Sequence, residues 1–177
     1  MNAKNEIAVL GAGCFWCTEA VYQQLKGVVS VEPGYAGGHT EHPTYQHVSS
    51  GETGHAEVAR IEFNPEVITY QNLLDVFFSA HDPTTLNRQG NDVGSQYRSV
   101  IFTTTPDQKD IAEQSIKNRV PNYPGPILTE VRQLDVFYPA EDYHKDYYNA
   151  HKDEPYCQLV ITPKIKKVQE HHAELIG

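Results

Sequence analysis

Cysteine is scarce in this chain of 177 residues, which contains only three. Small domains that rely on disulfides in place of a large core need a much higher cysteine content, so the composition excludes a disulfide scaffold. In a reducing compartment, isolated cysteines are more often buried or catalytic than bridged. Cys14, Cys17 and Cys157 must therefore be judged one by one from their surroundings.

Positive charge is scarce as well. Lys and Arg number 14 against 23 Asp and Glu, which gives a formal net charge of -9 at pH 7. A surface with this balance repels phosphate backbones, and the sequence has no basic stripe of the kind that nucleic-acid-binding proteins present. The composition thus predicts that nucleic acid is not a partner.

Long apolar runs are also missing. The N-terminal stretch holds only a short apolar run at residues 7–10, which is too short for a signal peptide or a membrane span. We therefore expect a cytoplasmic protein with no membrane partner. No internal repeat or low-complexity linker divides the chain, so residues 1–177 are expected to form a single domain.

The hydrophobic pattern changes repeatedly between strand-like alternation and helical spacing, which predicts an α+β fold with helices on a mainly antiparallel sheet. The predicted strands are 6–10, 28–35, 56–64, 99–103 and 127–137. The predicted helices are 15–25, 70–80, 107–119 and a short Tyr-rich helix from about residue 141. A strand-like apolar run follows at 158–161. Residues 81–98 form a long polar loop, and loops of that length in compact domains are usually functional.

Cys14 lies where a predicted strand turns sharply into a predicted helix, after glycines at positions 11 and 13. Unpaired backbone N–H groups at a helix N-terminus stabilise a thiolate. They lower a thiol pKa from its ordinary value of about 8.5, and the thiolate is the form that attacks electrophiles. Cys14 is therefore a candidate nucleophile. The alternative at this point is a small buried hydrophobic residue beside a tight turn.

Glu57 is an acidic residue where the strand pattern calls for an apolar one. Side-chain alternation places it on the same face as Ala59, Ile61 and Phe63, which is expected to be buried. A carboxyl group in an apolar setting has a raised pKa and can hold a proton near neutral pH, as a general acid must. The alternative is a position at the end of the strand, where the core gives way to water.

Tyr45 and Tyr97 both lie in stretches rich in Gly, Pro and Ser, which predicts loop positions. Neutral phenols in loops can donate hydrogen bonds to a polar substrate atom. With 11 tyrosines in the chain, the pattern alone does not assign these two a role.

Five sequence blocks, in their order and spacing, resemble the A-type peptide methionine sulfoxide reductases, which repair methionine after oxidative stress. The blocks are residues 13–16 (Gly-Cys-Phe-Trp), 34–38 (Gly-Tyr-Ala-Gly-Gly), 43–45 (Pro-Thr-Tyr), 53–57 (Thr-Gly-His-Ala-Glu) and the long segment 81–99. The resemblance covers most of the chain from about residue 7 to about residue 148.

The resemblance implies roles for individual residues. Cys14 would be the nucleophile, and Phe15 and Trp16 would form the apolar wall that receives the S-methyl group of the substrate. Glu57 would protonate the sulfoxide oxygen.

Three further residues have implied roles at the same site. Tyr45 and Tyr97 would hydrogen-bond the sulfoxide oxygen, and Asp92 would orient the substrate or brace its loop. The implied fold is a two-layer α/β sandwich around a ferredoxin-like core.

The resemblance also implies the substrates and the partner. The expected substrates are the S epimers of free methionine sulfoxide and of oxidised methionine in proteins. The sulfenic acid left on Cys14 would condense with a second thiol, and thioredoxin or another dithiol would reduce the resulting disulfide. This chemistry requires no metal and no organic cofactor.

The second thiol is open between two residues. Cys157, in the C-terminal segment of about residues 150–177, occupies the place where many relatives carry a resolving cysteine, but the glycines that flank that cysteine in relatives are missing here. A strand at 158–161 would restrict the movement of Cys157 towards Cys14, which is an argument against it. Cys17 is always near Cys14 but belongs to the helical turn itself. We expect Cys157 to be the resolving residue. The alternatives are Cys17 and direct reduction of the sulfenic acid without a resolving thiol.

Two other functions compete with this interpretation. The Cys-x-x-Cys of Cys14 and Cys17 is typical of general thiol-disulfide oxidoreductases, although disulfide exchange needs no acid such as Glu57. A metal-binding module is the second alternative. Its candidate ligands beside the cysteines are His39, His42, His47 and His55. Their spacings match no usual zinc pattern, so we expect no metal site.

Overall fold

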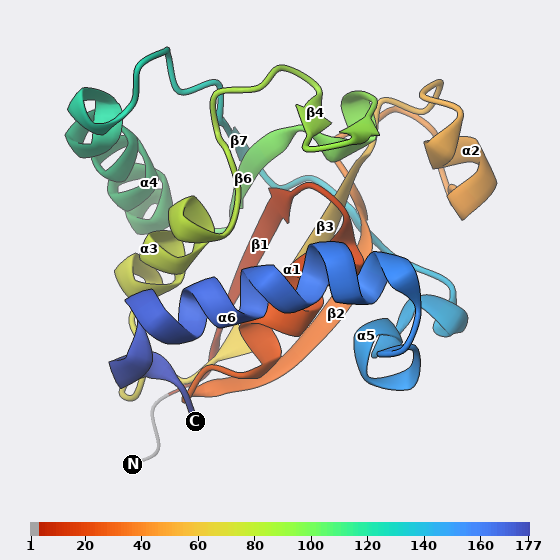
Figure 1. Ribbon diagram of the computed structural model, residues 1–177. Helices are drawn as coiled ribbons and strands as arrows, with labels where there is room; N and C mark the ends of the chain where they lie inside the picture. The colour runs from red at the N-terminus through yellow and green to blue at the C-terminus, as the bar shows by residue number, and fades with distance from the viewer. Residues whose placement is uncertain (1–3) are drawn as a thin grey trace.

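The computed structural model describes residues 4–177 as helices packed on one face of a sheet (Figure 1). The first three residues, part of the N-terminal stretch considered above for a signal peptide, lie outside the described residues. Among residues 4–177, no helix is long and apolar enough to cross a membrane.

The main sheet has six strands in the order β7-β6-β1-β3-β2-β8. These strands are β1 (Glu6–Ala12), β2 (Val28–Ala36), β3 (Ala56–Phe63), β6 (Ser99–Thr103), β7 (Glu130–Gln133) and β8 (Phe137–Pro139). β1 runs antiparallel to β3 and β6, and β2 runs antiparallel to β3 and β8. β6 and β7 are parallel. The fold is therefore α+β with a mixed sheet.

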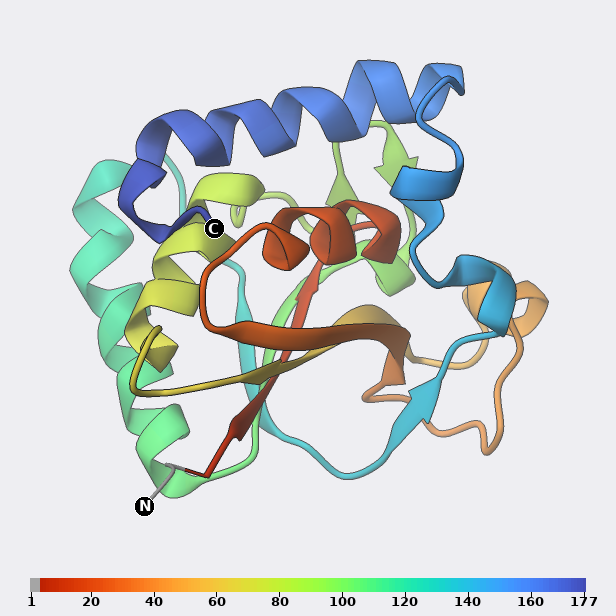
Figure 2. The ribbon, with the colours of Figure 1, turned by 90° about the horizontal axis from the view of Figure 1, so that it is seen from below.

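The helices gather on one side of this sheet, as Figure 2 shows from below. The longer helices are α1 (Phe15–Gln23), α3 (Tyr70–Ala80), α4 (Pro106–Arg119) and α6 (Thr162–His171). Two short helices, α2 (Tyr45–Ser49) and α5 (Tyr147–Ala150), and a small hairpin of β4 (Arg88–Gln89) and β5 (Asp92–Val93) lie around the N-terminal end of α1. Short 3₁₀ or π turns occur at Ser95–Tyr97, Val120–Asn122, Asp142–His144, Cys157–Ile161 and Ala173–Leu175.

The main core lies between the sheet and the helices. Leu10 and Ile61 from the sheet pack with Tyr22 of α1 and with Leu73 and Phe77 of α3, and all five are almost fully buried. Burial of one such apolar side chain stabilises the fold by roughly 1.5–3 kcal/mol. This core fixes α1 against the centre of the sheet, and so it fixes the position of the helix N-terminus.

A smaller core covers the opposite face of the sheet. Val9, Val58 and Phe102 are buried there against Leu134 and Phe137. The chain between β7 and β8 supplies this cover, because β7 lies at one edge of the sheet and β8 at the other. Strands β1, β3 and β6 are therefore buried on both faces, which explains their nearly continuous apolar sequence.

Local sequence explains where the helices begin. Thr69 and Asn72 form a reciprocal capping box at the start of α3. Thr105 caps α4, and Pro106 follows at the first helical position, where no backbone N–H is needed. These signals account for the close agreement of α3 and α4 with the predicted helices 70–80 and 107–119. Helices α2 and α6 were not predicted.

Two predicted strands are wrong. The stretch 127–137 is not one strand: it forms β7 and β8 on opposite edges of the sheet. The run at 158–161 is helical and leads directly into α6, with Pro163 in the first turn of that helix. A short apolar run fits a buried strand and a buried helical turn equally well, and only tertiary packing decides between them.

Candidate active site

Cys14 is the N-cap residue of α1, immediately after β1 and Gly13. Gly13 has a φ of 97°, and a Cβ atom at this position would lie 2.9 Å from the side chain of Gln89. Only glycine fits both the backbone angle and the space. The turn therefore brings Cys14 to the helix N-terminus, where it is 8% exposed.

Glu57 lies on β3 beneath the first turn of α1. Its Oε1 atom accepts a hydrogen bond from the backbone N–H of Phe15 at 3.1 Å, and its Oε2 atom is buried without a partner. Burial raises the pKa of Glu57 to about 8, and the charges of Asp92 and Cys17 raise it further, although the Phe15 N–H acts in the opposite direction. Glu57 is thus protonated at neutral pH, with a free oxygen beside the N-terminus of α1.

The pKa of Cys14 differs from the sequence-based expectation. Burial raises the pKa of this thiol well above its ordinary value, and the hydrogen bond with Cys17 and the charge of Glu57 raise it further. The expectation that the helix N-terminus lowers this pKa is therefore wrong, because desolvation outweighs the helix end. Cys14 keeps its proton in the resting site.

Cys17 is the more acidic thiol of the pair. The hydrogen bond from Cys14 is the main cause that lowers the pKa of Cys17 to about 7, against the effect of burial, and the charge of Lys164 contributes. The Cys14 thiol and the Cys17 thiolate therefore share one proton near neutral pH.

Tyr45 and Tyr97 both reach this group. Tyr45 begins α2, which the sequence analysis missed, and Tyr97 ends a short 3₁₀ turn. Burial raises the pKa of each phenol, and the nearby charges of Glu57 and Cys14 add to the increase. Both phenols are therefore neutral donors, and the structure brings both to Cys14 and Glu57.

Phe15 and Trp16 form an aromatic surface next to Cys14. Phe15 is fully buried and stacks on Tyr45 with the ring centres 6.4 Å apart. Trp16 is half-buried and stacks flat on Tyr147 of α5 at 3.7 Å. The indole N–H of Trp16 donates to Nδ1 of His144 at 3.0 Å. Burial lowers the pKa of His144, so this imidazole is neutral and available as the acceptor.

Asp92 is linked to the thiols through Tyr156. The hydroxyl of Tyr156 donates to Oδ2 of Asp92 at 2.8 Å and lies 3.8 Å from Sγ of Cys17. The sequence pattern does not single out Tyr156. The one sequence feature that could have indicated a role for Tyr156 is its position directly before Cys157, the expected resolving residue.

The three cysteines belong to one buried cluster with Ala20 and Ile161. All three are free thiols, and Cys157 is fully buried. The C-terminal segment thus places Cys157 close to the pair on α1. The prediction that it carries the resolving thiol is compatible with this position, but its helical conformation differs from the expected strand.

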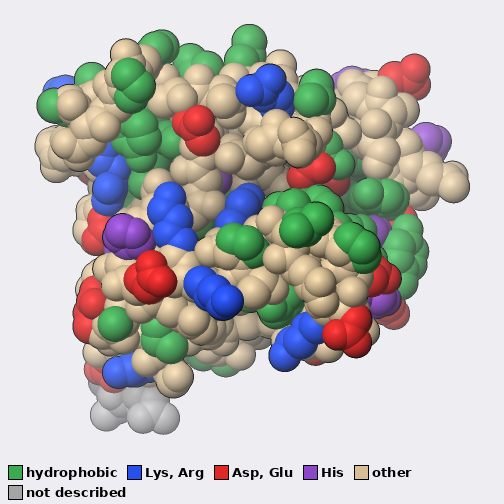
Figure 3. Space-filling model, viewed as in Figure 1, with side chains coloured by type: hydrophobic (Ala, Val, Ile, Leu, Met, Phe, Trp, Pro, Cys, Tyr) green, Lys and Arg blue, Asp and Glu red, His purple; other side chains and the backbone are tan. Residues whose placement is uncertain are grey.

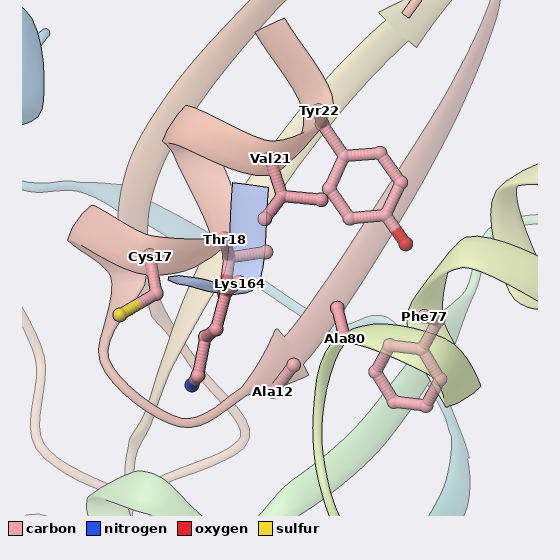
Figure 4. A pocket seen from close by; sticks show the side chains of 8 residues that line it. All are labelled: Ala12, Cys17, Thr18, Val21, Tyr22, Phe77, Ala80 and Lys164. Carbon is pink, nitrogen blue, oxygen red and sulfur yellow. The ribbon is translucent and has the colours of Figure 1, made fainter. Parts of the chain in front are cut away.

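A small pocket behind Cys17 explains the influence of Lys164 (Figure 4). Cys17, Thr18, Val21 and Phe77 line it together with Lys164, whose side chain is drawn beside that of Cys17. Figure 3 shows basic side chains on the face that α6 crosses, although the chain is acidic overall. The pocket reaches Cys17 but is lined by neither Cys14 nor Glu57.

The candidate metal ligands are not arranged around a common point. Within residues 4–177, no three His, Cys, Asp or Glu side chains are grouped as a metal site. Nδ1 of His55 accepts the backbone N–H of Gly38 at 3.0 Å, and Nε2 lies 2.7 Å from the carbonyl oxygen of Thr40. His55 is thus used to hold the loop after β2.

Comparison with known families identifies the chemistry of this arrangement. Residues 6–175 match the family model described as peptide methionine sulfoxide reductase. The chain belongs to the peptide methionine sulfoxide reductase family. It is therefore an enzyme that reduces methionine sulfoxide, and the resemblance found from the sequence blocks is confirmed.

Individual relatives agree over nearly the whole chain. The protein named peptide methionine sulfoxide reductase MsrA of Sulfolobus acidocaldarius is 57% identical over 166 residues, which are 94% of this chain and 94% of that relative. A protein of the same name from Thermus thermophilus is 50% identical over 171 residues, which are 97% of each chain.

Solved structures of this methionine sulfoxide reductase family share the fold. Reduced Mxr1 from Saccharomyces cerevisiae has a TM-score of 0.82 at 35% identity, over 87% of this chain and 90% of that one. Mxr1 in complex with Trx2 has a TM-score of 0.60 at 27% identity, over 83% of this chain and 87% of that one.

Proposed function

We propose that this enzyme is a peptide-methionine (S)-S-oxide reductase in which Cys14 attacks the sulfoxide sulfur while Glu57 protonates the oxygen. The observation that carries this proposal is the buried Oε2 atom of Glu57, which has no partner and belongs to a carboxyl group with a pKa of about 8. A sulfoxide oxygen is an acceptor that fits such a protonated group.

The chemistry needs this acid because a sulfoxide sulfur is a poor electrophile until its oxygen is protonated or strongly hydrogen-bonded. Glu57 supplies the proton, and the neutral phenols of Tyr45 and Tyr97 donate hydrogen bonds to the same oxygen. The Cys14 thiol gives up its proton during the attack to the hydrogen-bonded Cys17 thiolate. In sum, the Cys14 thiol and the sulfoxide yield a sulfenic acid and a thioether.

The aromatic surface selects the substrate. Phe15 and Trp16 receive the S-methyl group, and Asp92 orients the substrate side of the site through Tyr156. With the methyl group bound on one side and the hydrogen-bond donors to the oxygen on the other, only one sulfoxide epimer presents its sulfur to Cys14. We assign the S epimer, in free methionine sulfoxide and in oxidised methionine of proteins, without a metal or organic cofactor.

A second thiol of the cluster then condenses with the Cys14 sulfenic acid, and Cys157 takes part in the disulfide that is finally reduced. The reductant is thioredoxin or a similar dithiol. The crystallised complex of the related Mxr1 with Trx2 supports this choice. The three free thiols also support a reducing, cytoplasmic location.

A general disulfide oxidoreductase is the less favoured alternative. The helix N-terminus with Cys14 and Cys17 would suit it, but a buried protonated acid and two phenols have no use in disulfide exchange. Reduction of insulin disulfides at a rate above that of methyl sulfoxides would favour this alternative.

We further propose that the chain is one catalytic domain with a ferredoxin-like centre. The four strands β1, β2, β3 and β6 support this, because they are ordered β6-β1-β3-β2 with antiparallel neighbours and are connected through α1 and α3. The shared core of α1, α3 and α6 supports a single domain.

Turnover with separated epimers tests the proposed function. The wild-type chain, with thioredoxin, thioredoxin reductase and NADPH, should reduce the S epimer of a methyl sulfoxide and leave the R epimer unchanged. Cys14→Ser should abolish the reaction with both. Turnover of the R epimer, or full activity of Cys14→Ser, would refute the assignment.

A further inference from the structure

Cys17 is placed to bond with Cys14 without movement of the backbone. The N–H of Cys17 donates to the carbonyl oxygen of Cys14 at 3.1 Å, the i to i+3 contact of a tight turn. Such turns keep the two Cα atoms within about 7 Å, and disulfides span Cα separations of about 4.4–6.8 Å. Cys14 and Cys17 also belong to the same buried cluster. Cys17 is thus the thiol next to the sulfur that becomes oxidised.

Cys157, in contrast, lies in a segment that is held on both sides. It begins the π turn Cys157–Ile161, which continues into α6. The chain contains no glycine between positions 125 and 177. Two hydrogen bonds hold the segment. The hydroxyl of Tyr156 donates to Asp92, and the hydroxyl of Tyr148 lies 2.7 Å from that of Thr162. Cys157 therefore reacts with a sulfur that it already faces, because a longer movement would require the segment to unwind.

The segment of Cys157 contacts Cys17, and the two cysteines belong to the same buried cluster. The residue before Cys157 is Tyr156, and its hydroxyl lies 3.8 Å from Sγ of Cys17. The charge of Cys17 also acts on Cys157: it contributes, after burial and Glu154, to the raised pKa of that thiol. Cys17 is therefore in contact with Cys14 on one side and with the segment of Cys157 on the other.

We propose that Cys17 is the first resolving thiol and that it passes the oxidation on to Cys157. This inference rests on the sulfenic acid mechanism proposed above. The Cys17 thiol attacks the sulfur of the Cys14 sulfenic acid, so that the S–S bond forms, the S–O bond breaks, and the hydroxyl group leaves as water with the thiol proton.

In the second step, the Cys157 thiol attacks the sulfur of Cys17 in the Cys14–Cys17 disulfide. The Cys17–Cys157 bond forms, the bond to Cys14 breaks, and the proton of Cys157 passes to Cys14. Cys14 is thereby restored as a thiol, while the two oxidising equivalents remain in the Cys17–Cys157 disulfide. The enzyme can then reduce a second sulfoxide before any external reductant arrives.

Two single variants separate this relay from direct resolution by Cys157. Wild-type enzyme, Cys17→Ser and Cys157→Ser are each mixed with S-epimer methyl sulfoxide without reductant. Quenched samples are treated with dimedone to trap sulfenic acid and with an alkylating agent to block thiols, and disulfides are mapped by peptide mass spectrometry. Released methyl sulfide is counted per chain.

The relay predicts a reciprocal result. Cys157→Ser should lose its sulfenic acid as fast as the wild type, accumulate the Cys14–Cys17 bridge and release one methyl sulfide. Cys17→Ser should form the Cys14 sulfenic acid more slowly, because it lacks the thiolate that accepts the Cys14 proton. Once formed, its dimedone-reactive Cys14 should persist at least tenfold longer than in the wild type. In the wild type, the Cys14–Cys17 bridge should precede the Cys17–Cys157 bridge, and two methyl sulfides should be released per chain.

The opposite pattern overturns the relay. Fast formation of a Cys14–Cys157 bridge in Cys17→Ser, together with a persistent sulfenic acid in Cys157→Ser, would show direct resolution. The wild-type time course gives an independent answer that needs no variant: a Cys14–Cys157 bridge as its first disulfide would refute the relay alone. A wild-type chain that releases no methyl sulfide would refute the proposed function itself.

Discussion

At the scale of single residues, burial has opposite consequences for the two groups that act on the substrate. It raises the pKa of Glu57 to about 8 and so keeps on this carboxyl the proton that the sulfoxide oxygen needs. It also raises the pKa of Cys14, which works against the thiolate that must attack. Cys17 eases this conflict, because its lower pKa leaves it as a thiolate near neutral pH, which is the form that can accept the Cys14 proton as Cys14 attacks. The apolar site thus depends on a second thiol as well as on the acid.

The first prediction concerns Glu57→Gln. The amide keeps an acceptor for the N–H of Phe15 but cannot deliver a proton to the substrate oxygen. We expect the single-turnover rate of sulfide formation to fall by about 10²-fold or more, the usual loss when a general acid is removed. Circular dichroism should show an unchanged fold.

The pH profile provides the control for this role. A Glu57 pKa of about 8 means that the active protonated form is lost as the pH rises through this value. The wild-type rate should decline above pH 8, and Glu57→Gln should lack this alkaline decline. Glu62→Gln, on the same strand, should keep both rate and profile, since the Glu62 side chain makes only a long contact with Ser30. An alkaline limb that persists in Glu57→Gln would assign the proton to another group.

The sequence predicts the positions of Cys14 and Glu57 because both depend on local rules. A glycine-rich strand-to-helix turn delivers Cys14, and period-2 alternation turns Glu57 towards α1. The contact between Tyr156 and Cys17 could not be predicted in this way, because these residues are 139 positions apart. The pKa of Cys14 was mispredicted for the same reason, since burial by distant segments determines it.

At the scale of elements, α5 and the turn before it hold the aromatic surface of Phe15 and Trp16 in place. Tyr147 supports one face of Trp16, and His144 accepts its indole N–H. Glu141 holds β2 and the start of α2, because its carboxylate accepts hydrogen bonds from the hydroxyl of Tyr35 and from the backbone N–H of Tyr45, both at 2.8 Å. These contacts join the C-terminal segment to the parts of the site on α1, β2 and α2.

The second prediction tests this support through Tyr147→Ala. Loss of the stacked ring should free the indole of Trp16, weaken substrate binding and raise KM several-fold with a smaller change in kcat. Trp16 is the only tryptophan of the chain. Its fluorescence therefore reports on the site, and it should shift to longer wavelength and become more accessible to acrylamide.

Tyr143→Ala is the matched control, because the Tyr143 side chain is 62% exposed and its ring packs on His144 rather than on Trp16. It should leave the fluorescence maximum and KM close to those of the wild type. An unchanged emission maximum and an unchanged KM in Tyr147→Ala would mean that Phe15 and His144 keep the indole of Trp16 in place without α5.

The sequence predicts most elements but fails where the choice depends on distant packing. The strands and helices with strong periodicity and caps appear close to their expected ranges. The split of 127–137 into β7 and β8 could not be predicted, because it depends on which sheet edges are free for pairing. The helical form of 158–161 depends likewise on the buried contacts of Cys157 and Ile161.

At the scale of the whole molecule, the fold buries two carboxyl groups on the same side of the sheet. Besides Glu57, burial raises the pKa of Glu19 to about 7, against the effect of the backbone N–H groups of Asp146 and Tyr147. Glu19 thus lies between α1 and the start of α5. Both carboxyls hold their protons more tightly in the folded than in the unfolded chain, so the stability of the whole domain is linked to pH.

The third prediction follows from the sign of this linkage. Between pH 4.5 and about 7, the folded state holds a proton on Glu19 that the unfolded state has lost. The stabilising effect of Glu19 is therefore fully present below the ordinary pKa of 4.5, and it is lost as the pH rises towards about 7. Glu19→Gln remains neutral and keeps an acceptor for the N–H groups of α5. After allowance for solvent screening, it should be more stable than the wild type by about 1–2 kcal/mol at pH 8, equivalent to a few degrees in Tm for a domain of this size. At pH 4.5 the two should be nearly equal. Urea denaturation at pH 4.5, 6 and 8 measures this difference, and Glu66→Gln, at an exposed position, is the control. If the free energy of unfolding of wild type and of Glu19→Gln changed with pH in parallel, Glu19 would not carry the linkage.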